Sequence, residues 1–427
     1  MSLNDVLVSL DIGTSQIKVI IGEVLNDSLN IIGVGTAKST GLRKGAIVDI
    51  DETVKSIKEA VEQAEHMVDM TINNVVVAVN ANHVQLHSCH GVVAVQSENR
   101  EIGDEDVTRV IEAAQVMSIP PEREIIDVIP KQFIVDGFDE ISDPRGMIGV
   151  RLEMEGTIIT TSKTALHNVL RCVERAGLHI VDVVLQPLAA GTIALSKDER
   201  NLGVALIDVG GGCTTVSVFE DNFLAASSVI PLGGENITKD LSIGMRTSTE
   251  EAEEIKLHYG HAFYETADED EKVEVSIIGS NEKKTFNQLE ISDMIEARLE
   301  EIYELALREL RRMGYHDLRG GYILTGGTMK MPGALDLAQA VFESNARIAI
   351  PDYIGVREPQ YTVGIGTIQF AHQNAKVQGK ELGTSVTLDE PSPNRKVKET
   401  NKKEFTDKGT EQNKGSKMAN FFKSFFE

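Results

Sequence analysis

The sequence has few cysteines and few basic residues for its length. Its three cysteines, Cys89, Cys172 and Cys213, lie too far apart for a disulfide framework or a thiolate zinc site. Its 42 basic residues against 66 acidic ones give a net charge of −24. This charge argues against general nucleic-acid binding, because a surface that follows phosphates needs clustered lysine and arginine. Met1 is followed by no basic and then apolar signal segment, so we expect a cytoplasmic protein.

The rest of the composition is typical of a globular protein. The chain has 427 residues, of which 41% are hydrophobic and 25% charged. This length and balance are sufficient for two domains, each with its own core.

A glycine-rich stretch at 204–218 predicts a β-hairpin with an unusually bare turn. An apolar run ends at Asp208, three glycines follow, and a second run rich in β-branched residues begins. Glycines let backbone N–H groups approach an anion, threonine hydroxyls add donors, and Asp208 lies where a phosphate-bound Mg²⁺ or its water can be held. A tight turn without a ligand is the alternative for this hairpin alone. The residues of this predicted phosphate turn are Gly210, Gly211, Gly212, Cys213, Thr214 and Thr215.

The chain begins with the same pattern. The apolar run 7–10 is followed by Asp11 and a short turn, and then by a second apolar run. A third strand follows in each copy, at 29–36 and at 223–231. The duplication predicts two similar halves that face each other across a cleft and hold a nucleotide between their turns. The residues of this first turn are Gly13, Thr14, Ser15, Gln16 and Lys18.

Each half contains an insertion. The segment 83–162 interrupts the first half with short strands, one helix near 106–117 and proline breakers. We interpret its His83, His87 and His90 as ordinary strand and loop residues, because no finger-like or helical context supports metal ligation. In the second half, 236–313 is inserted after the third strand and ends in a long helix at 289–313.

Two further strand ends carry candidate site residues. Gln186 lies where the strand 180–185 meets a helix, and it either orients a water or bonds to the helix N-terminus. Gly326 and Gly327 follow a strand that begins at Tyr322, and they either admit a nucleoside or are plain turn glycines.

Together these motifs resemble the actin-like ATPase superfamily. The resemblance implies an α/β fold: a duplicated actin-like or ribonuclease-H-like architecture with two domains around a nucleotide cleft, each with an inserted subdomain. It further implies ATP with Mg²⁺ held through waters near Asp11 and Asp208, and Lys18 near the outer phosphates. The residues that it implies around the nucleoside are Gly233, Gly234, Lys256, Gly326, Gly327 and Met329.

Within this superfamily the chain more closely resembles the FtsA family of bacterial cell-division proteins. The loop from Thr36 to Asp51 is too short for the subdomain that actin inserts there, and the insertion at 83–162 has the place it has in the FtsA family. The resemblance implies self-association, other division proteins as partners, and docking of the FtsZ C-terminal peptide on 236–313. Arginines for an acidic peptide are Arg298, Arg308, Arg311 and Arg312. For any single arginine, a solvated helix face is the alternative.

The C-terminal region predicts a tethered amphipathic helix. The segment 376–415 loses apolar periodicity, which predicts a disordered linker. In 416–427, one helix face would be apolar, and the segment is too short to span a bilayer, so we expect it to lie in the membrane interface. Docking of this face on a protein is the alternative. The apolar face consists of Met418, Phe421, Phe422, Phe425 and Phe426, and the opposite face contains Lys417 and Lys423.

These expectations define six segments. They are 1–82 with 163–198 (first core), 83–162 (first insertion), 199–235 with 314–375 (second core), 236–313 (second insertion), 376–415 (linker) and 416–427 (membrane helix).

The predicted function is an ATP-binding, self-associating adaptor that tethers the FtsZ ring to an anionic membrane at the septum. No strong base stands beside the phosphate turns, so we expect at most slow ATP hydrolysis, with Asp208 and Gln186 placing a water. The alternatives are a small-molecule kinase of the same superfamily, a filament protein of the cell-shape type, and a pilus-assembly protein.

Overall fold

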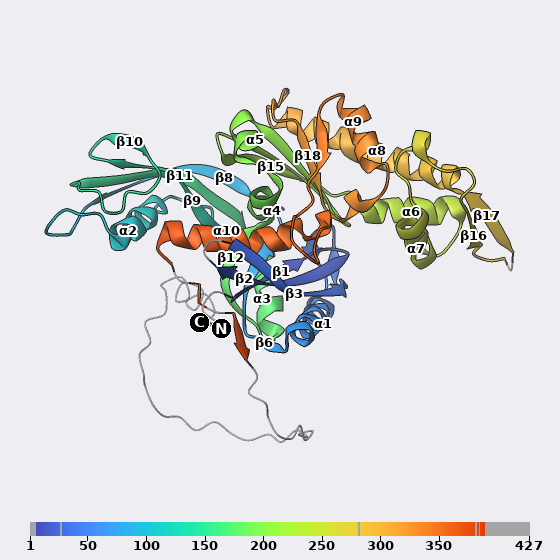
Figure 1. Cartoon of the computed structure of the whole chain (residues 1–427), viewed down its shortest axis with the longest axis horizontal. Helices are drawn as coiled ribbons and strands as arrows, with labels where there is room; N and C mark the ends of the chain where they lie inside the picture. The colour runs from blue at the N-terminus through green and yellow to red at the C-terminus, as the bar shows by residue number, and fades with distance from the viewer. Residues whose placement is uncertain (1–5, 26–27, 281, 381, 384, 389–427) are drawn as a thin grey trace, which may run out of the picture.

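Two five-stranded sheets with the same plan form the body of the protein (Figure 1). The computed structural model describes residues 6–25, 28–280, 282–380, 382–383 and 385–388. In each sheet three consecutive antiparallel strands are followed by two strands that pair in parallel. The α/β fold and both hairpins are therefore confirmed.

The strand orders of the two sheets correspond position by position when one of them is read in reverse. The first sheet has the order β12-β7-β1-β2-β3 and the second β15-β14-β13-β18-β19. The first comprises β1 (Val6–Ile12), β2 (Gln16–Leu25), β3 (Ser28–Lys38), β7 (Asn74–Val79) and β12 (His179–Leu185). The second comprises β13 (Val204–Val209), β14 (Thr214–Glu220), β15 (Phe223–Ile230), β18 (Tyr322–Thr325) and β19 (Ala346–Ile348).

Helices cover both faces of the first sheet, which explains why β1 is buried along its whole length. On one face lie α1 (Ile50–Val68) and α3 (Lys163–Arg175). On the other lie α4 (Gln186–Ala194) and α10 (Thr362–Gln378), which cross closely. The crossing requires glycine at 366, because a Cβ there would lie 1.9 Å from the Ala189 carbonyl oxygen.

Helix α10 packs on the first sheet, although the sequence analysis assigned residues up to 375 to the second core. Val363 and Ala371 belong to the same hydrophobic cluster as β1 and β7. The position of α10 in the chain, directly after the second half, gave no indication of this, because only tertiary packing decides which sheet a connecting helix covers.

The first insertion is a separate sheet with its own core. The strands β8 (Gln85–Ala94), β9 (Arg123–Val135), β10 (Phe138–Ile141) and β11 (Arg151–Ser162) have the order β10-β9-β11-β8 and are covered by α2 (Asp104–Ala114). Three of these strands have ten or more residues, whereas the sequence predicted short strands. Pro130 does not end β9, because it lies opposite Gly156 where the β9–β11 register shifts, and such irregularities tolerate proline.

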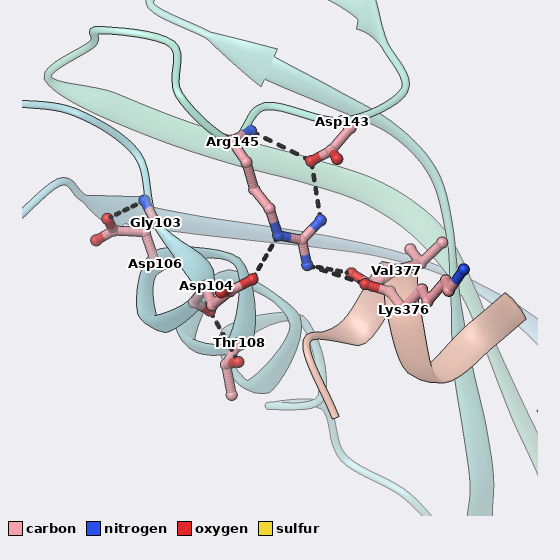
Figure 2. Close-up of polar contacts among 8 residues, drawn as sticks. All are labelled: Gly103, Asp104, Asp106, Thr108, Asp143, Arg145, Lys376 and Val377. Carbon is pink, nitrogen blue, oxygen red and sulfur yellow. Dashed lines mark hydrogen bonds and ion pairs between the residues drawn. The ribbon is translucent and has the colours of Figure 1, made fainter. Parts of the chain in front are cut away.

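Arg145 fixes this insertion to the end of α10 (Figure 2). Its Nε donates to Asp104 Oδ1 at 2.6 Å and its Nη1 to Asp143 Oδ1 at 2.9 Å. Its Nη2 donates to the carbonyl oxygens of Lys376 and Val377, at 3.2 Å and 2.9 Å. A cation at the C-terminus of a helix also interacts favourably with the helix dipole.

A second polar contact lies nearby. Asp127 accepts hydrogen bonds from Asn374 Nδ2 at 2.8 Å and from Gln378 Nε2 at 3.0 Å. Burial, together with the charge of Asp127, raises the pKa of neighbouring Asp182 to about 7. The insertion is thus held to one turn of α10 at two points.

The second insertion is mainly helical. It comprises α6 (Gly234–Met245), α7 (Thr249–Tyr259), a 3₁₀ turn at Tyr264–Thr266, the hairpin β16 (Lys272–Ser276) and β17 (Lys283–Asn287), and α8 (Gln288–Arg312). The β16–β17 hairpin and the first insertion lie at opposite ends of the long axis of the molecule (Figure 1).

The last described residues return to the first half. Strand β20 (Val386–Leu388) pairs antiparallel with β6 (Met70–Ile72), and Ser385 N–H donates to the Val6 carbonyl at 2.8 Å. The prediction of disorder from 376 onward is therefore wrong for the end of α10 and for β20. The predicted linker from residue 389 onward and the predicted helix at 416–427 lie outside the described residues.

Smaller elements complete the fold. They are β4 (Leu42–Arg43), β5 (Ala46–Ile47), α5 (Lys197–Leu202), α9 (Ala334–Phe342), and 3₁₀ turns at Gly327–Lys330 and Pro359–Tyr361.

Candidate functional site

The turns of the two hairpins touch each other. A Cβ on Gly211 would lie 1.7 Å from Ser15 Oγ, and a Cβ on Gly212 would lie 2.6 Å from Thr14 Oγ1. Each turn is closed by the same backbone bond: Gly13 N–H donates to Gln16 at 3.1 Å, and Gly210 N–H donates to Cys213 at 3.0 Å. The two predicted phosphate turns therefore form one site.

Asp11 is the most buried acidic residue of this site, with 4% of its surface exposed. Its Oδ2 pairs with Lys18 Nζ at 3.2 Å, and its Oδ1 accepts from Gln186 Nε2 at 2.9 Å. Gln186 therefore uses its amide nitrogen on the first hairpin. The N-cap residue of α4, Leu185, makes no side-chain cap bond.

Asp208 faces the same place from the second hairpin. Burial is the main cause that raises the pKa of Asp208, to about 6, and the charge of Asp11 adds to it, whereas Lys18 opposes it. Within the described ranges, no hydrogen bond or ion pair engages the Asp208 side chain. Two carboxylates facing one lysine suit a divalent cation, which prefers oxygen ligands.

A small cavity adjoins these residues. Its volume of about 10 Å³ is close to the smallest that holds one water molecule. Asp208 and Gln186 both contribute to its wall, which places the two residues predicted to position a water beside a water-sized space. The other lining residues are Pro187, Ala190, Leu206, Thr215 and Ser217.

The start of α6 packs against the turn of the second hairpin. Gly234 N–H donates to the Gly210 carbonyl at 2.9 Å, and a Cβ on Gly233 would lie 2.5 Å from the same oxygen. Lys256 Nζ donates to the Gly234 carbonyl at 3.2 Å and pairs with Glu253 Oε2 at 2.7 Å.

The third glycine turn, which follows β18, lies against Asp208 and the second hairpin. Gly326 has a φ of +98°, and a Cβ there would lie 2.3 Å from Asp208 Oδ1. Thr328 Oγ1, which the sequence analysis missed, donates to the Gly210 carbonyl at 3.2 Å. The structure thus gathers the glycines of all three strand ends, together with Lys256.

Met329 lies elsewhere. It is 2% exposed, and Tyr303 OH lies 3.5 Å from its Sδ, so its side chain is part of the second core. Any contact of Met329 with a nucleotide would therefore come from its backbone.

Three other residues of the site were also missed. Gly45 N–H donates to Thr14 Oγ1 at 3.1 Å, and Asn80 Nδ2 donates to Cys213 Sγ at 3.6 Å. Ser15 Oγ donates to Glu235 Oε1 at 3.4 Å. Burial raises the pKa of the Cys213 thiol to about 11, so this thiol stays protonated at neutral pH. The glycine at 45 was the available signal, because it follows a basic residue in a short turn between the third strand and the first helix.

The four candidate arginines on α8 are not equivalent. Arg298 pairs with Asp240 and Glu301, and Arg312 pairs with Glu309. Arg308 and Arg311 instead line a groove of about 640 Å³ between α8 and α9. The groove also contains the apolar residues Phe263, Leu307, Leu337, Ala340 and Val341 and the acidic residues Glu296, Glu300, Glu304 and Glu343.

The described residues contain neither a cluster of metal ligands nor a membrane-spanning helix. Among the described residues, no group of three or more histidine, cysteine, aspartate or glutamate residues is arranged to hold a metal ion. This finding also applies to His83, His87 and His90. No helix among these residues is both long and apolar enough to cross a membrane.

The duplicated sheets and facing glycine turns define an actin-like protein. Solved structures agree with this fold. A PilM–PilN type IV pilus biogenesis complex superposes with a TM-score of 0.57 at 18% identity, covering 85% of this chain and 97% of that one. MreB5 of Spiroplasma citri bound to ADP superposes with a TM-score of 0.53 at 14% identity, covering 87% and 98%.

Sequence comparisons give the family. The model described as "Cell division protein FtsA" matches residues 205–366, and "SHS2 domain inserted in FTSA" matches 81–160. Cell division protein FtsA of Bacillus subtilis (strain 168) is 62% identical, covering 90% of this chain and 87% of that protein. FtsA of Enterococcus faecalis is 44% identical, covering 87% and 85%. The chain belongs to the FtsA family of cell division proteins.

Proposed function

We propose that this protein is an ATP-binding, self-associating adaptor that tethers FtsZ filaments to the cytoplasmic face of the cell membrane at the division septum. The observation that carries the proposal is the meeting of two phosphate turns beside the carboxylates of Asp11 and Asp208. Nucleotide is also present in an actin-like neighbour, MreB5, which was solved with ADP and with AMPPNP.

The site residues have separable roles in nucleotide binding. Backbone N–H groups of the two turns and the hydroxyls of Thr14 and Thr215 would bind phosphate oxygens. The Thr214 hydroxyl is not available for this role, because it is buried and donates to the Leu232 carbonyl at 2.9 Å. Asp11 and Asp208 would hold Mg²⁺ through waters, and the ion would neutralise phosphate charge. Lys18 would pair with the outer phosphates, because its ammonium already lies in the site, 3.2 Å from Asp11.

Hydrolysis would be slow. Gln186 and Asp208 line a space for one water, which they would orient towards the terminal phosphate. Neither is a strong base: an amide takes no proton at neutral pH, and the Asp208 carboxylate would be engaged with the metal and its waters.

The groove between α8 and α9 is the proposed docking place of the FtsZ C-terminal peptide. Its lining combines five apolar side chains and four glutamates with two arginines, Arg308 and Arg311, for which no ion pair occurs within the described part of the chain. Arg298 and Arg312 form ion pairs with carboxylates of their own chain, so we assign the peptide contact to Arg308 and Arg311.

Membrane attachment rests on the sequence of 416–427. One such helix would bind lipid weakly, because interfacial burial of its phenylalanines is partial and the helix must order on binding. Self-association would present many copies, and avidity would then make attachment firm.

Liposome co-sedimentation tests the adaptor. The full chain and a chain ending at Gly415 are compared on anionic vesicles, each with and without Mg-ATP. We expect the full chain to pellet with lipid and the shortened chain to remain in the supernatant. If both remain in the supernatant under every nucleotide condition, the membrane role is wrong, and docking of the phenylalanine face on a protein is the better account.

Titration with an FtsZ C-terminal peptide tests the groove. Reversing charge in Arg308→Glu with Arg311→Glu is expected to weaken binding by about tenfold or more, from the loss of two charged contacts. Arg312→Glu is the matched control, because Arg312 lies on the same helix and is paired with Glu309. Equal affinities of the double variant and the control would refute this docking site.

A further inference from the structure

A two-residue turn lies against the place where the phosphate turns meet. The short strands β4 and β5 are joined by Lys44 and Gly45, with φ values of +50° and +73°. Positive φ at both positions is the geometry of a type I′ hairpin turn, in which asparagine or glycine usually occupies the first position. A lysine there is strained by about 1 kcal/mol. The strain raises the question of what the lysine contributes.

The backbone of this turn contacts both hairpins. Gly45 N–H donates to Thr14 Oγ1 of the first hairpin at 3.1 Å. A Cβ on Gly45 would lie 3.3 Å from Cys213 Sγ of the second hairpin, and 3.0 Å from the Nδ2 atoms of Asn80 and Asn82. The amide of Asn82 also donates to the Lys44 carbonyl at 3.4 Å. The turn is thus fixed against the junction of the two phosphate turns.

The hydrogen bond to Thr14 has a chemical consequence. A threonine hydroxyl has one proton to donate and two lone pairs to accept with. Because Gly45 N–H occupies one lone pair, the hydroxyl keeps its proton for an acceptor elsewhere. A phosphate oxygen between the two hairpins is such an acceptor.

The acidic side chains around the site outnumber the lysines that are not already paired. Asp11, Asp208 and Glu235 are acidic, Lys18 is paired with Asp11, and Lys256 is paired with Glu253. Lys44 is exposed, and its side chain has no ion pair within the described ranges. Its flexible four-carbon stem gives the ammonium reach beyond the fixed backbone of the turn.

We propose that the Lys44–Gly45 turn is a third phosphate-binding element, in which Gly45 orients the Thr14 hydroxyl and Lys44 pairs with the terminal phosphate of a nucleoside triphosphate. The inference rests on the proposed nucleotide binding. It adds that the site distinguishes a triphosphate from a diphosphate by a contact that only the triphosphate makes.

The test compares Lys44→Asn and Lys44→Arg by titration with Mg-ATP and with Mg-ADP. Asparagine suits a positive φ better than lysine, so Lys44→Asn removes the charge without straining the turn, and its unfolding temperature is expected to be unchanged or higher. We expect Lys44→Asn to bind Mg-ATP about tenfold more weakly, from the loss of a charge-assisted contact, and Mg-ADP nearly as well as the wild type. Lys44→Arg should retain most of the affinity for Mg-ATP.

Two results would overturn the inference while nucleotide binding itself stands. One is a Lys44→Asn variant that binds Mg-ATP as the wild type does, and the other is an equal loss of Mg-ATP and Mg-ADP binding. Wild-type protein that binds neither nucleotide would instead refute the proposed function, and the inference with it.

Discussion

Gln186 donates a hydrogen bond from Nε2 to Oδ1 of Asp11 at 2.9 Å, although the two residues are 175 positions apart in the chain. The bond joins the start of α4 to the first hairpin, while Lys18 holds the other oxygen of the same carboxylate. Because the amide nitrogen binds Asp11, the amide oxygen is the atom that Gln186 can offer to a water in the adjoining cavity. Its role is therefore open to a direct test.

Gln186→Ala should separate binding from hydrolysis. Removing the amide takes away the proposed acceptor for the water but leaves the phosphate turns intact, so single-turnover hydrolysis of ATP should slow by about tenfold or more. The dissociation constant for Mg-ATP should change by less than about threefold. An unchanged rate would show that Gln186 has only a structural role beside Asp11.

Asp208→Asn should abolish one component of the pH dependence of stability. The pKa of Asp208 is about 6 in the folded protein, because burial and the charge of Asp11 disfavour the carboxylate, whereas the unfolded chain releases this proton near pH 4. The contribution of the neutral Asp208 carboxyl to the free energy of unfolding is thus fully present below pH 4, and it is lost as the pH rises through 6. Without nucleotide or Mg²⁺, the variant should be more stable than the wild type by about 2–3 kcal/mol at pH 7.5.

Urea unfolding of both proteins at several pH values measures this difference. It should shrink steadily towards pH 4.5, and a difference that is constant with pH would contradict the raised pKa. In the same variant, Mg-ATP affinity should fall, since an amide replaces a carboxylate that would hold the metal waters.

Arg145→Ala should loosen the end of α10. The change removes four hydrogen bonds and leaves the carboxylates of Asp104 and Asp143 without their shared cation (Figure 2). We expect a loss of about 2 kcal/mol in the free energy of unfolding and faster amide exchange at Gly379 and Lys380.

Arg175→Ala is the control for this variant. Arg175 also pairs with an aspartate, Asp51, at 2.6 Å, but both side chains are largely exposed, and such pairs contribute about 0–1 kcal/mol. Similar losses in the two variants would mean that Arg145 is an ordinary surface residue.

Gly366→Ala should disrupt the crossing of α10 and α4. Its Cβ would lie 1.9 Å from the Ala189 carbonyl oxygen, and because this neighbour is backbone, the two helices must separate. The expected loss is about 3 kcal/mol, measured by thermal or urea unfolding without nucleotide. For Gly327→Ala, where the nearest atom to the new Cβ is 3.8 Å away, the loss should be below about 1 kcal/mol.

Local sequence patterns predicted the two hairpins. The features that these patterns did not predict depend on contacts between residues that are distant in the sequence. The order of apolar run, aspartate and glycine turn is contained within about fifteen residues of sequence, so both phosphate turns and their strands could be located. By contrast, nothing near Gln186 indicates that it bonds to Asp11, because that contact depends on the order of the sheet, in which β7 lies between β12 and β1.

The same reason explains the errors at the C-terminus. The polar composition after Lys376 predicted disorder, yet Val386 pairs with β6 and is buried in the same hydrophobic cluster as Val6 and Ile72. Likewise, helix α10 follows the second half in sequence but covers the sheet of the first. A sequence pattern states which surfaces are apolar and leaves open which partner covers them.

The short pairing of β20 with β6 determines how the protein would respond to a pull. Three residue pairs join this strand to β6, Ser385 exchanges backbone hydrogen bonds with Val6, Asn73 and Asn74, and the chain continues from Leu388 beyond these contacts. If that chain were anchored to a surface while the body was pulled away, these contacts would bear the load first, because they lie nearest to the anchored end. Detachment of Gly379 to Leu388 would lengthen the connection by about 35 Å of extended chain, so a sudden load would be absorbed by added length while both halves of the body remained folded.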